Sequence, residues 1–264
     1  MDNVGRVERA RLRPTTQTGA DDVMSGSNTI LVLKTGEALA PVKQYCGDFE
    51  EWIARGLGCP IEEVEVAAVH AGDPLPEAES LGGVVVTGSP AMVTERAGWS
   101  EDSARWLGVI VERDTIPVLG LCYGHQLIAH ALGGEVGVNP RGREMGTVEV
   151  SLPVAGLEGD PLFEPGVFPG HMSHLESVLL PPTNARVIAT TQLEPHAALQ
   201  FGPRQWGVQF HPEFDREIMQ RYVEARREVL VSEGFDPDSM IDAAVETHAL
   251  TRVLGRFARM VDRA

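Results

Sequence analysis

The chain has 264 residues, of which 43% are hydrophobic and 23% charged, a composition that can bury a sizeable core. Acidic residues outnumber basic ones by 38 to 22, and the formal charge of -16 would repel nucleic-acid phosphates and anionic membrane surfaces. We therefore expect neither nucleic acid nor a membrane as a partner. Three cysteines without the dense spacing of a disulfide scaffold favour a reducing, cytoplasmic location.

The ends of the chain differ in character from its centre. Residues 1–27 carry four arginines but lack the apolar segment of a secretory signal, and no apolar run in the sequence is long enough to span a bilayer. We predict a disordered tail over residues 1–27, one α/β domain over residues 28–232 and a helical extension over residues 233–264. No internal repeat or mid-chain linker indicates a further domain boundary.

The first half alternates short β-branched runs with segments of helical periodicity, which is the pattern of βαβ units around a parallel sheet. The predicted strands cover residues 29–33, 64–69, 83–88 and 117–121. The helices between them are indicated by apolar residues at helical spacing, namely Phe49, Trp52, Ile53 and Leu57, then Trp106, Leu107, Ile110 and Val111. Another helix is expected over residues 126–132, before a glycine pair.

Shorter strand-like segments follow, and their pattern predicts mixed or antiparallel pairing at residues 146–150, 186–190 and 197–201. A buried strand over residues 206–210 comes next, and Asp215 can cap a helix that continues to about residue 230. A last amphipathic segment places Val253, Leu254, Phe257 and Met260 on one side. The predicted fold class is therefore α/β, a three-layer sandwich with a central, mostly parallel sheet.

Cys122 lies between the fourth predicted strand and the next helix, in the sequence Gly120-Leu-Cys-Tyr-Gly124. This is the form of a nucleophile elbow with cysteine as the nucleophile. The two glycines remove the Cβ atoms that would collide in so tight a turn. Because a helix N-terminus favours the thiolate, the sequence predicts that Cys122 attacks a carbonyl carbon. Cys46 and Cys59 lack this context and are expected to be inert.

His211-Pro-Glu213 directly follows the buried strand over residues 206–210. His211 should therefore emerge at the same carboxyl edge of the sheet as Cys122. A cysteine nucleophile needs a base, and the base needs a group that orients it. Glu213 can accept a hydrogen bond from one imidazole nitrogen and leave the other facing the sulfur. The sequence thus predicts a catalytic triad of Cys122, His211 and Glu213.

The two segments Gly120-Leu-Cys-Tyr-Gly-His-Gln126 and Gln209-Phe-His-Pro-Glu213 together resemble the class I, triad-type glutamine amidotransferase family. The similarity extends to residues 86–90, 139–142 and 171–176, so that it covers about residues 29–230. The resemblance implies the flavodoxin-like fold of that family. It also implies a stand-alone member that is similar to the glutaminase part of GMP synthetase.

The resemblance further implies an oxyanion hole, in which two backbone N–H groups stabilise the charge that develops on the attacked carbonyl. One donor is Tyr123. The other is Gly88 or Ser89, because the loop here departs from the usual Gly-Gly-Pro form of the family. The family pattern also implies four substrate contacts: Gln126, and the backbone of Ser173, His174 and Leu175.

Other polar residues give weaker indications. His171 and His174 have the spacing of metal ligands on a helix, but a Pro-Gly pair before them argues against a helix and no second ligand pair exists, so we predict no metal. His125 is expected to be structural. A surface ion cluster or turn is expected from three loop residues, with substrate contact as the alternative: Arg141, Arg143 and Glu144.

The predicted function is cleavage of the γ-amide of glutamine through a glutamyl thioester, with release of ammonia and without a cofactor. The sequence contains no P-loop of the GxxxxGK[ST] form, so the chemistry that accepts the ammonia is expected either on a separate synthetase or not at all. One alternative is a γ-glutamyl peptide hydrolase, which would use the same residues. The other is a non-catalytic binding or redox-sensing protein.

Overall fold

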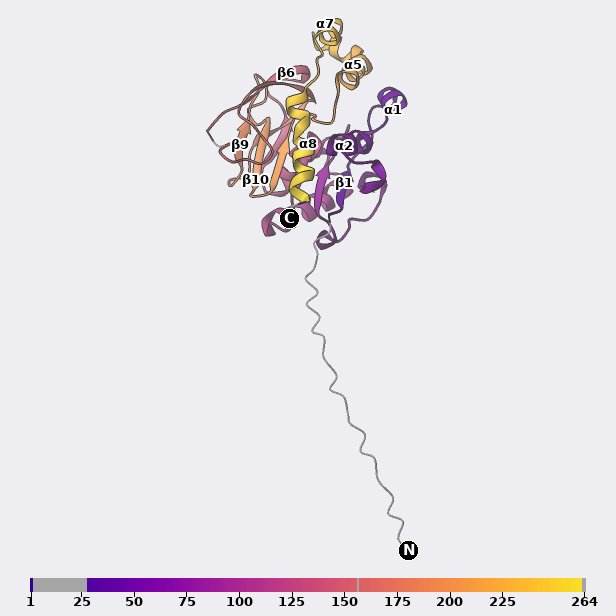
Figure 1. Ribbon diagram of the computed structural model, residues 1–264. Coiled ribbons are helices and arrows are strands. Elements are labelled where there is room, and N and C mark those ends of the chain that lie inside the picture. The colour runs from indigo at the N-terminus through magenta and orange to yellow at the C-terminus, as the bar shows by residue number, and fades with distance from the viewer. Residues whose placement is uncertain (2–27, 156, 263–264) are drawn as a thin grey trace.

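The computed structural model describes residues 1, 28–155 and 157–262, so the tail predicted at the N-terminus lies, apart from its first residue, outside the described residues. A seven-stranded sheet has the order β2-β1-β3-β4-β11-β10-β9 (Figure 1). β10 runs opposite in direction to the other six strands, so its pairings with β9 and β11 are antiparallel and all other pairings are parallel. These strands are β1 (Ile30–Lys34), β2 (Val64–Ala68), β3 (Gly83–Val86), β4 (Val118–Leu121), β9 (Arg186–Ala189), β10 (Ala198–Gly202) and β11 (Gln205–Val208).

Helices cover both faces of this sheet and form the outer two of three layers. Along β1 the side chains alternate between two hydrophobic clusters, with Ile30 and Val32 in one and Leu31 and Leu33 in the other. The first cluster includes residues of α2 (Phe49–Leu57), α5 (Arg216–Ala225) and α8 (His248–Val261). The second includes residues of α3 (Gly98–Arg113) and α4 (Tyr123–Ala131). Figure 1 shows α8 lying beside α2.

Two antiparallel strand pairs extend the fold beyond the central sheet. β6 (Glu144–Leu152) pairs with β7 (Gly166–His174), and β5 (Glu135–Val138) pairs with β8 (Glu176–Leu180). Leu175 therefore lies between two strands that belong to different pairs. The remaining helices are α1 (Ala40–Cys46), α6 (Arg227–Ser232) and α7 (Pro237–Asp242).

The α/β fold class is confirmed, and β1 to β4 and β11 lie where the sequence predicts them, within two residues at each end. The helix expected after Asp215 is wrong in one respect, because it is interrupted at Arg226 between α5 and α6. The backbone of Arg226 has φ -108° and ψ 10°, outside the helical range. Several elements were missed: α1, β5, β7 and β8.

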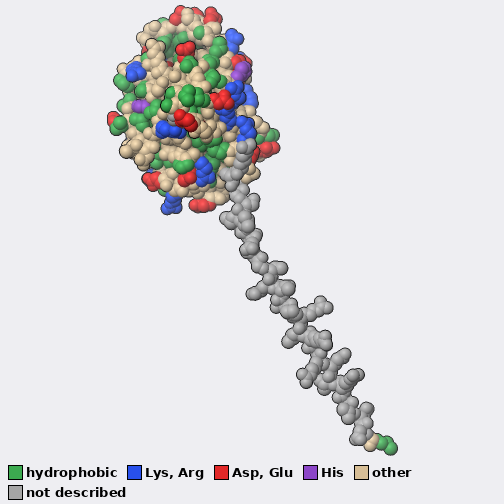
Figure 2. All heavy atoms as spheres, turned by 60° about the vertical axis from the view of Figure 1, so that its left-hand side comes forward, with side chains coloured by type: hydrophobic (Ala, Val, Ile, Leu, Met, Phe, Trp, Pro, Cys, Tyr) green, Lys and Arg blue, Asp and Glu red, His purple; other side chains and the backbone are tan. Residues whose placement is uncertain are grey.

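The surface carries charges of both signs. On the face drawn in Figure 2, acidic and basic side chains are scattered among apolar and uncharged ones. Among the described residues, no helix combines the length and the apolar character that a bilayer crossing requires.

Candidate active site around Cys122

Cys122 joins β4 to α4 in a strained turn, with φ 47° and ψ -96°. Positive φ is rare for a residue with a Cβ, and such strain is concentrated at functional sites. The flanking glycines permit the turn. A Cβ on Gly120 would lie 2.6 Å from the backbone of Gly124, and a Cβ on Gly124 would lie 2.6 Å from the Val86 carbonyl oxygen. The elbow therefore requires glycine on both sides of the cysteine.

Strand pairing brings the histidine segment to this turn. β4 and β11 are parallel neighbours with Leu121 opposite Val208, and the Cys122 N–H donates to the Val208 carbonyl at 2.7 Å. His211 comes three residues after Val208 at the same edge of the sheet. Its Nδ1 lies 2.7 Å from Glu213 Oε1, and its ring lines the same hollow as Cys122 and interacts with it electrostatically. The fold thus brings Cys122 together with the other two predicted triad residues, which are far from it in the sequence.

The surroundings of His211 fix the ring and its charge. The imidazole stacks on Phe214 with the ring centroids 4.1 Å apart. The backbone N–H of His211 donates to the His171 carbonyl. Burial would lower the pKa of His211, but the charges of Glu213 and of a Cys122 thiolate outweigh burial and raise the pKa to about 10. His211 consequently carries a proton at neutral pH when the thiolate is present.

A chain of side-chain amides reaches the sulfur from the other side. Gln209 Nε2 donates to Cys122 Sγ at 3.3 Å. Gln209 Oε1 accepts from Gln126 Nε2 at 2.9 Å, and this same Nε2 donates to the Glu176 carbonyl at 2.7 Å. Gln126 therefore lies beside the site as expected, with its amide nitrogen engaged by the protein. Gln209 was not predicted as a site residue, although it belongs to the motif that ends in His211.

The loop after β3, which contains Gly88, Ser89 and Pro90, also lies beside Cys122. A Cβ on Gly88 would approach His211 Cε1 to 3.1 Å, so this glycine lets the loop pass close to the imidazole. Ser89 Oγ donates to the Thr35 carbonyl at 2.8 Å, which fixes the loop against the end of β1. Tyr123 is the first residue of α4, where a backbone N–H has no intrahelical acceptor. These are the predicted oxyanion positions.

Two hollows adjoin Cys122. The His211 hollow has a volume of about 20 Å³ and the Gln126 hollow about 80 Å³. Four residues besides Cys122 line both: Ser89, Pro90, Ser173 and Arg226. The His211 hollow is also lined by Glu37, Leu39, Phe49, His211 and Tyr222. The Gln126 hollow is also lined by Ala91, Met92, Tyr123, Gln126, Arg143, His174, Leu175 and Glu176.

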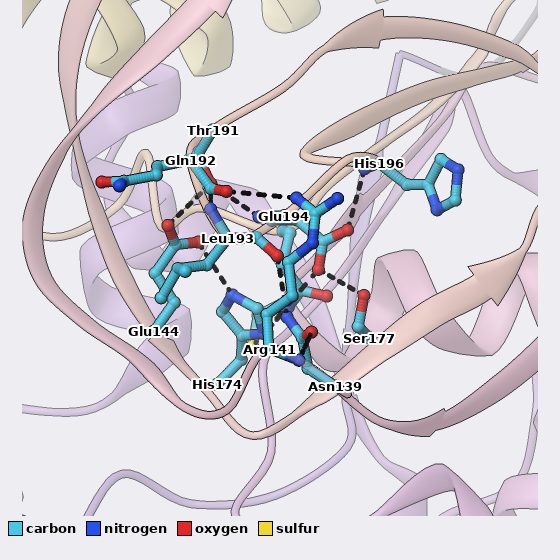
Figure 3. Close-up of polar contacts among 12 residues, drawn as sticks. Asn139, Arg141, Glu144, His174, Ser177, Thr191, Gln192, Leu193, Glu194 and His196 are labelled. Atoms are coloured by element: carbon cyan, nitrogen blue, oxygen red, sulfur yellow. Dashed lines mark hydrogen bonds and ion pairs between the residues drawn. The ribbon is translucent and has the colours of Figure 1, made fainter.

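The predicted substrate residues Ser173, His174 and Leu175 all line the Gln126 hollow. A buried polar cluster behind them holds His174 (Figure 3). His174 Nε2 lies 3.3 Å from Glu144 Oε2 and Nδ1 lies 2.9 Å from the Glu176 carbonyl. Since both ring nitrogens have partners within the protein, His174 is left to offer its backbone to a ligand.

Of the other predicted residues, Arg143 lines the Gln126 hollow, whereas His125, His171 and Arg141 line neither hollow. His171 is on β7, so its spacing from His174 is that of a strand, and its Nδ1 contacts Thr147 Oγ1 at 3.1 Å. His125 is fully buried, and burial lowers its pKa to about 3. Arg141 donates to the Gln192 carbonyl, and Arg143 forms two hydrogen bonds with Glu233.

Comparison with known proteins agrees with this geometry. Residues 43–227 match the family model for class-I glutamine amidotransferases, and the chain belongs to that family. The crystal structure of a glutamine amidotransferase from Thermotoga maritima has a TM-score of 0.70 at 21% identity, covering 89% of this chain and 98% of that one. At this identity the likeness shows the fold alone.

Two relatives show which members of the family this chain is similar to in sequence. The chain is 35% identical over 215 residues to the glutamine-hydrolyzing GMP synthase of Aeropyrum pernix, over 78% of this chain and 39% of the relative. It is 29% identical over 180 residues to the glutamine amidotransferase-like protein chry6 of Gibberella zeae, over 67% of this chain and 72% of the relative. The aligned region thus spans well under half the length of this GMP synthase.

Proposed function

We propose that the chain hydrolyses the side-chain amide of glutamine through a glutamyl thioester on Cys122. The contact of Cys122 with His211, whose other nitrogen is held by Glu213 at 2.7 Å, carries this proposal. A buried thiol, an imidazole and a carboxylate in this order form the arrangement that activates a cysteine nucleophile. Membership of the glutamine amidotransferase family supports glutamine as the substrate.

The reaction begins when the Cys122 thiolate attacks the amide carbon. The developing oxyanion accepts hydrogen bonds from Tyr123 N–H and from Gly88 or Ser89 N–H, each worth about 3 kcal/mol. His211 then gives its proton to the departing nitrogen, which leaves as ammonia, and the thioester remains. This acylation removes the thiolate charge, one of the charges that raise the pKa of His211. The pKa of His211 then falls, so that the neutral imidazole is available to accept a proton from the water that releases glutamate.

The size of the His211 hollow favours glutamine over a γ-glutamyl peptide. The leaving group must depart towards His211, and of the two hollows only this one is lined by His211. A volume of about 20 Å³ is enough for a molecule the size of water or ammonia. An amino acid as leaving group would require the surrounding side chains to move.

We propose further that the released ammonia is used by a synthetase. The named relatives include glutamine-hydrolyzing GMP synthases whose length this chain matches only in part. The identity of the acceptor that the ammonia attacks follows from that partner and is independent of the triad chemistry.

The test compares wild type with Cys122→Ala, using Cys59→Ala as the matched control. Purified protein is incubated under reducing conditions with glutamine or a γ-glutamyl dipeptide, and ammonia and glutamate are measured, with and without cell extract to supply a partner. Wild type and Cys59→Ala should release equal amounts of ammonia and glutamate from glutamine. Cys122→Ala should lose at least about 10⁴-fold in rate. Absence of both products from wild type in every condition would overturn the proposal, and faster cleavage of the dipeptide would change the substrate.

A further inference from the structure

Arg226 has an unusual position beside Cys122. It occupies the break between α5 and α6, and its side chain lines both the His211 hollow and the Gln126 hollow. Other residues that line both hollows are a proline, two serines and the cysteine itself. Arg226 is therefore the cation that both hollows share.

The guanidinium of Arg226 has no direct hydrogen-bonding or ion-pair partner within the described part of the chain. Its Nε is buried without a partner. The neighbouring arginines differ, because Arg143 is bidentate to Glu233 and Arg227 pairs with Glu224 and Asp238. Both carboxylate oxygens of Glu233 are thus already hydrogen bonded to Arg143. Burial and the nearby Arg143 charge lower the pKa of Arg226, and the opposing effects of Tyr222, Cys122 and Glu233 do not outweigh them.

An unpaired, partly buried cation costs free energy unless an anion compensates it. The chain has 38 acidic residues, yet none of those described pairs with this arginine. A guanidinium binds a carboxylate through two parallel hydrogen bonds, and such a pair is stronger than one between neutral groups. The missing partner is therefore best supplied by a carboxylate that enters with a ligand.

The proposed substrate supplies such a group. With its side-chain amide at Cys122, glutamine carries a single anionic group, the α-carboxylate, a short carbon chain away. The departing ammonia carries no negative charge, so it cannot satisfy the arginine. The backbone at Ser173 to Leu175, which lines the same Gln126 hollow, offers only neutral hydrogen-bonding groups.

We propose that Arg226 binds the α-carboxylate of the glutamyl substrate and makes a free carboxylate a requirement for binding at this site. This inference rests on the proposed glutaminase function. It assigns substrate selection to a residue that follows the triad by thirteen positions and lies at an interruption between two helices.

The kinetic test uses glutamine and its α-amide, in which a carboxamide replaces the α-carboxylate. Wild type should prefer glutamine by about 100-fold in kcat/KM, because the carboxamide leaves the guanidinium unpaired. Arg226→Gln should lose about 100-fold on glutamine and little on the α-amide, so that the preference disappears. Arg226→Lys, which keeps the charge without the bidentate geometry, should be intermediate. Arg227→Gln is the control and should behave as wild type.

A binding test separates this inference from the proposed function. Calorimetric titration of Cys122→Ala with glutamine measures affinity without turnover, and adding Arg226→Gln should weaken the Kd about 100-fold while adding Arg227→Gln should not. Equal losses of Arg226→Gln on both kinetic substrates, or an unchanged Kd, would overturn the inference and leave the hydrolysis intact. Arg226-dependent binding without hydrolysis by wild type would sustain the inference and overturn the function. If Arg226→Gln does not fold, equal cleavage of glutamine and its α-amide by wild type overturns the inference.

Discussion

The amide of Gln209 contacts the sulfur that the proposed reaction uses. The orientation of this amide group is set by its hydrogen bonds. Gln126 donates to Gln209 Oε1, and Gln209 Nε2 therefore faces Cys122 Sγ. A donor aimed at sulfur stabilises the thiolate more than the thiol. Gln209 is fully buried, and water therefore does not replace this hydrogen bond readily. At the scale of single residues, the reactivity of Cys122 depends on Gln209 as well as on His211.

Gln209→Leu tests this dependence. The rate of Cys122 alkylation by iodoacetamide at pH 7 should fall about tenfold, which corresponds to the loss of a charge-assisted hydrogen bond of about 1.5 kcal/mol. Modification is followed by mass spectrometry of the peptide that contains Cys122. Gln220→Leu removes an amide bonded to the distant Ile241 carbonyl and serves as control. Equal rates at pH 7 would refute the role of Gln209.

At the scale of elements, Asp48 ties the start of α2 to the end of β1. It caps α2 in a capping box with Glu51, and its carboxylate also accepts from Lys34 Nζ at 2.8 Å and from Ala38 N–H at 2.8 Å. Lys34 and Asp48 are both buried. The chain between them forms the loop that leads to α1, so this pair holds one side of the His211 hollow, where Leu39 and Phe49 lie.

Asp48→Asn should destabilise the fold by about 3 kcal/mol at pH 7, because buried Lys34 loses one of its two carboxylate partners and keeps only the partly exposed Glu50. Burial raises the pKa of Asp48, but hydrogen bonds from Lys34 and from Ala38 N–H outweigh burial and lower the pKa below its ordinary value. The stability due to this carboxylate is therefore full above the unfolded pKa and is lost as pH falls through the folded one. The difference between wild type and Asp48→Asn in urea unfolding should shrink below about pH 4.

The exposed Asp102, paired with Arg105 on the surface of α3, offers the control for this prediction. Asp102→Asn should change the free energy of unfolding by less than about 0.5 kcal/mol. A pH-independent difference for Asp48→Asn would contradict the assignment of its charge to stability.

At the scale of the whole molecule, α8 closes the core from outside the matched family region. The family match ends at residue 227, whereas α8 begins at His248. Leu254 packs so closely on α2 that a Cβ on Gly56 would lie 2.3 Å from its Cδ1. Leu250 approaches Gly170 on β7, the strand that also carries Ser173. The C-terminal helix thus supports both the sheet and one wall of the hollows.

Phe257→Ala should cost about 3–5 kcal/mol in the free energy of unfolding, since Phe257 is completely buried between α8 and the sheet. Urea unfolding measures this loss, and Arg252→Ala on the exposed side of α8 should change stability by less than about 0.5 kcal/mol. A cost below 1 kcal/mol for Phe257→Ala would mean that α8 contributes little to the core.

The sequence by itself determined the features that depend on local spacing. Gly120 and Gly124 around Cys122 define the elbow because only glycine tolerates the contacts there, and His211-Pro-Glu213 directly after a β-branched run places a histidine at a strand end. Apolar periodicity was sufficient for the sheet strands that lie in the core. It was insufficient for β7, which buries polar His171 and His174, and for β8, which buries Glu176 and Ser177 while its two leucines are exposed.

The tertiary structure alone decided which groups meet. Pairing of β4 with β11 sets Gln209 against the Cys122 sulfur, and no spacing within the chain specifies that neighbour across 87 residues. The break at Arg226 likewise lies within a stretch whose periodicity reads as one continuous helix. The sequence does not show whether an acidic side chain lies opposite a given arginine. Only the packing of α5 and α6 against the site shows that Arg226 is left with its charge unpaired beside Cys122.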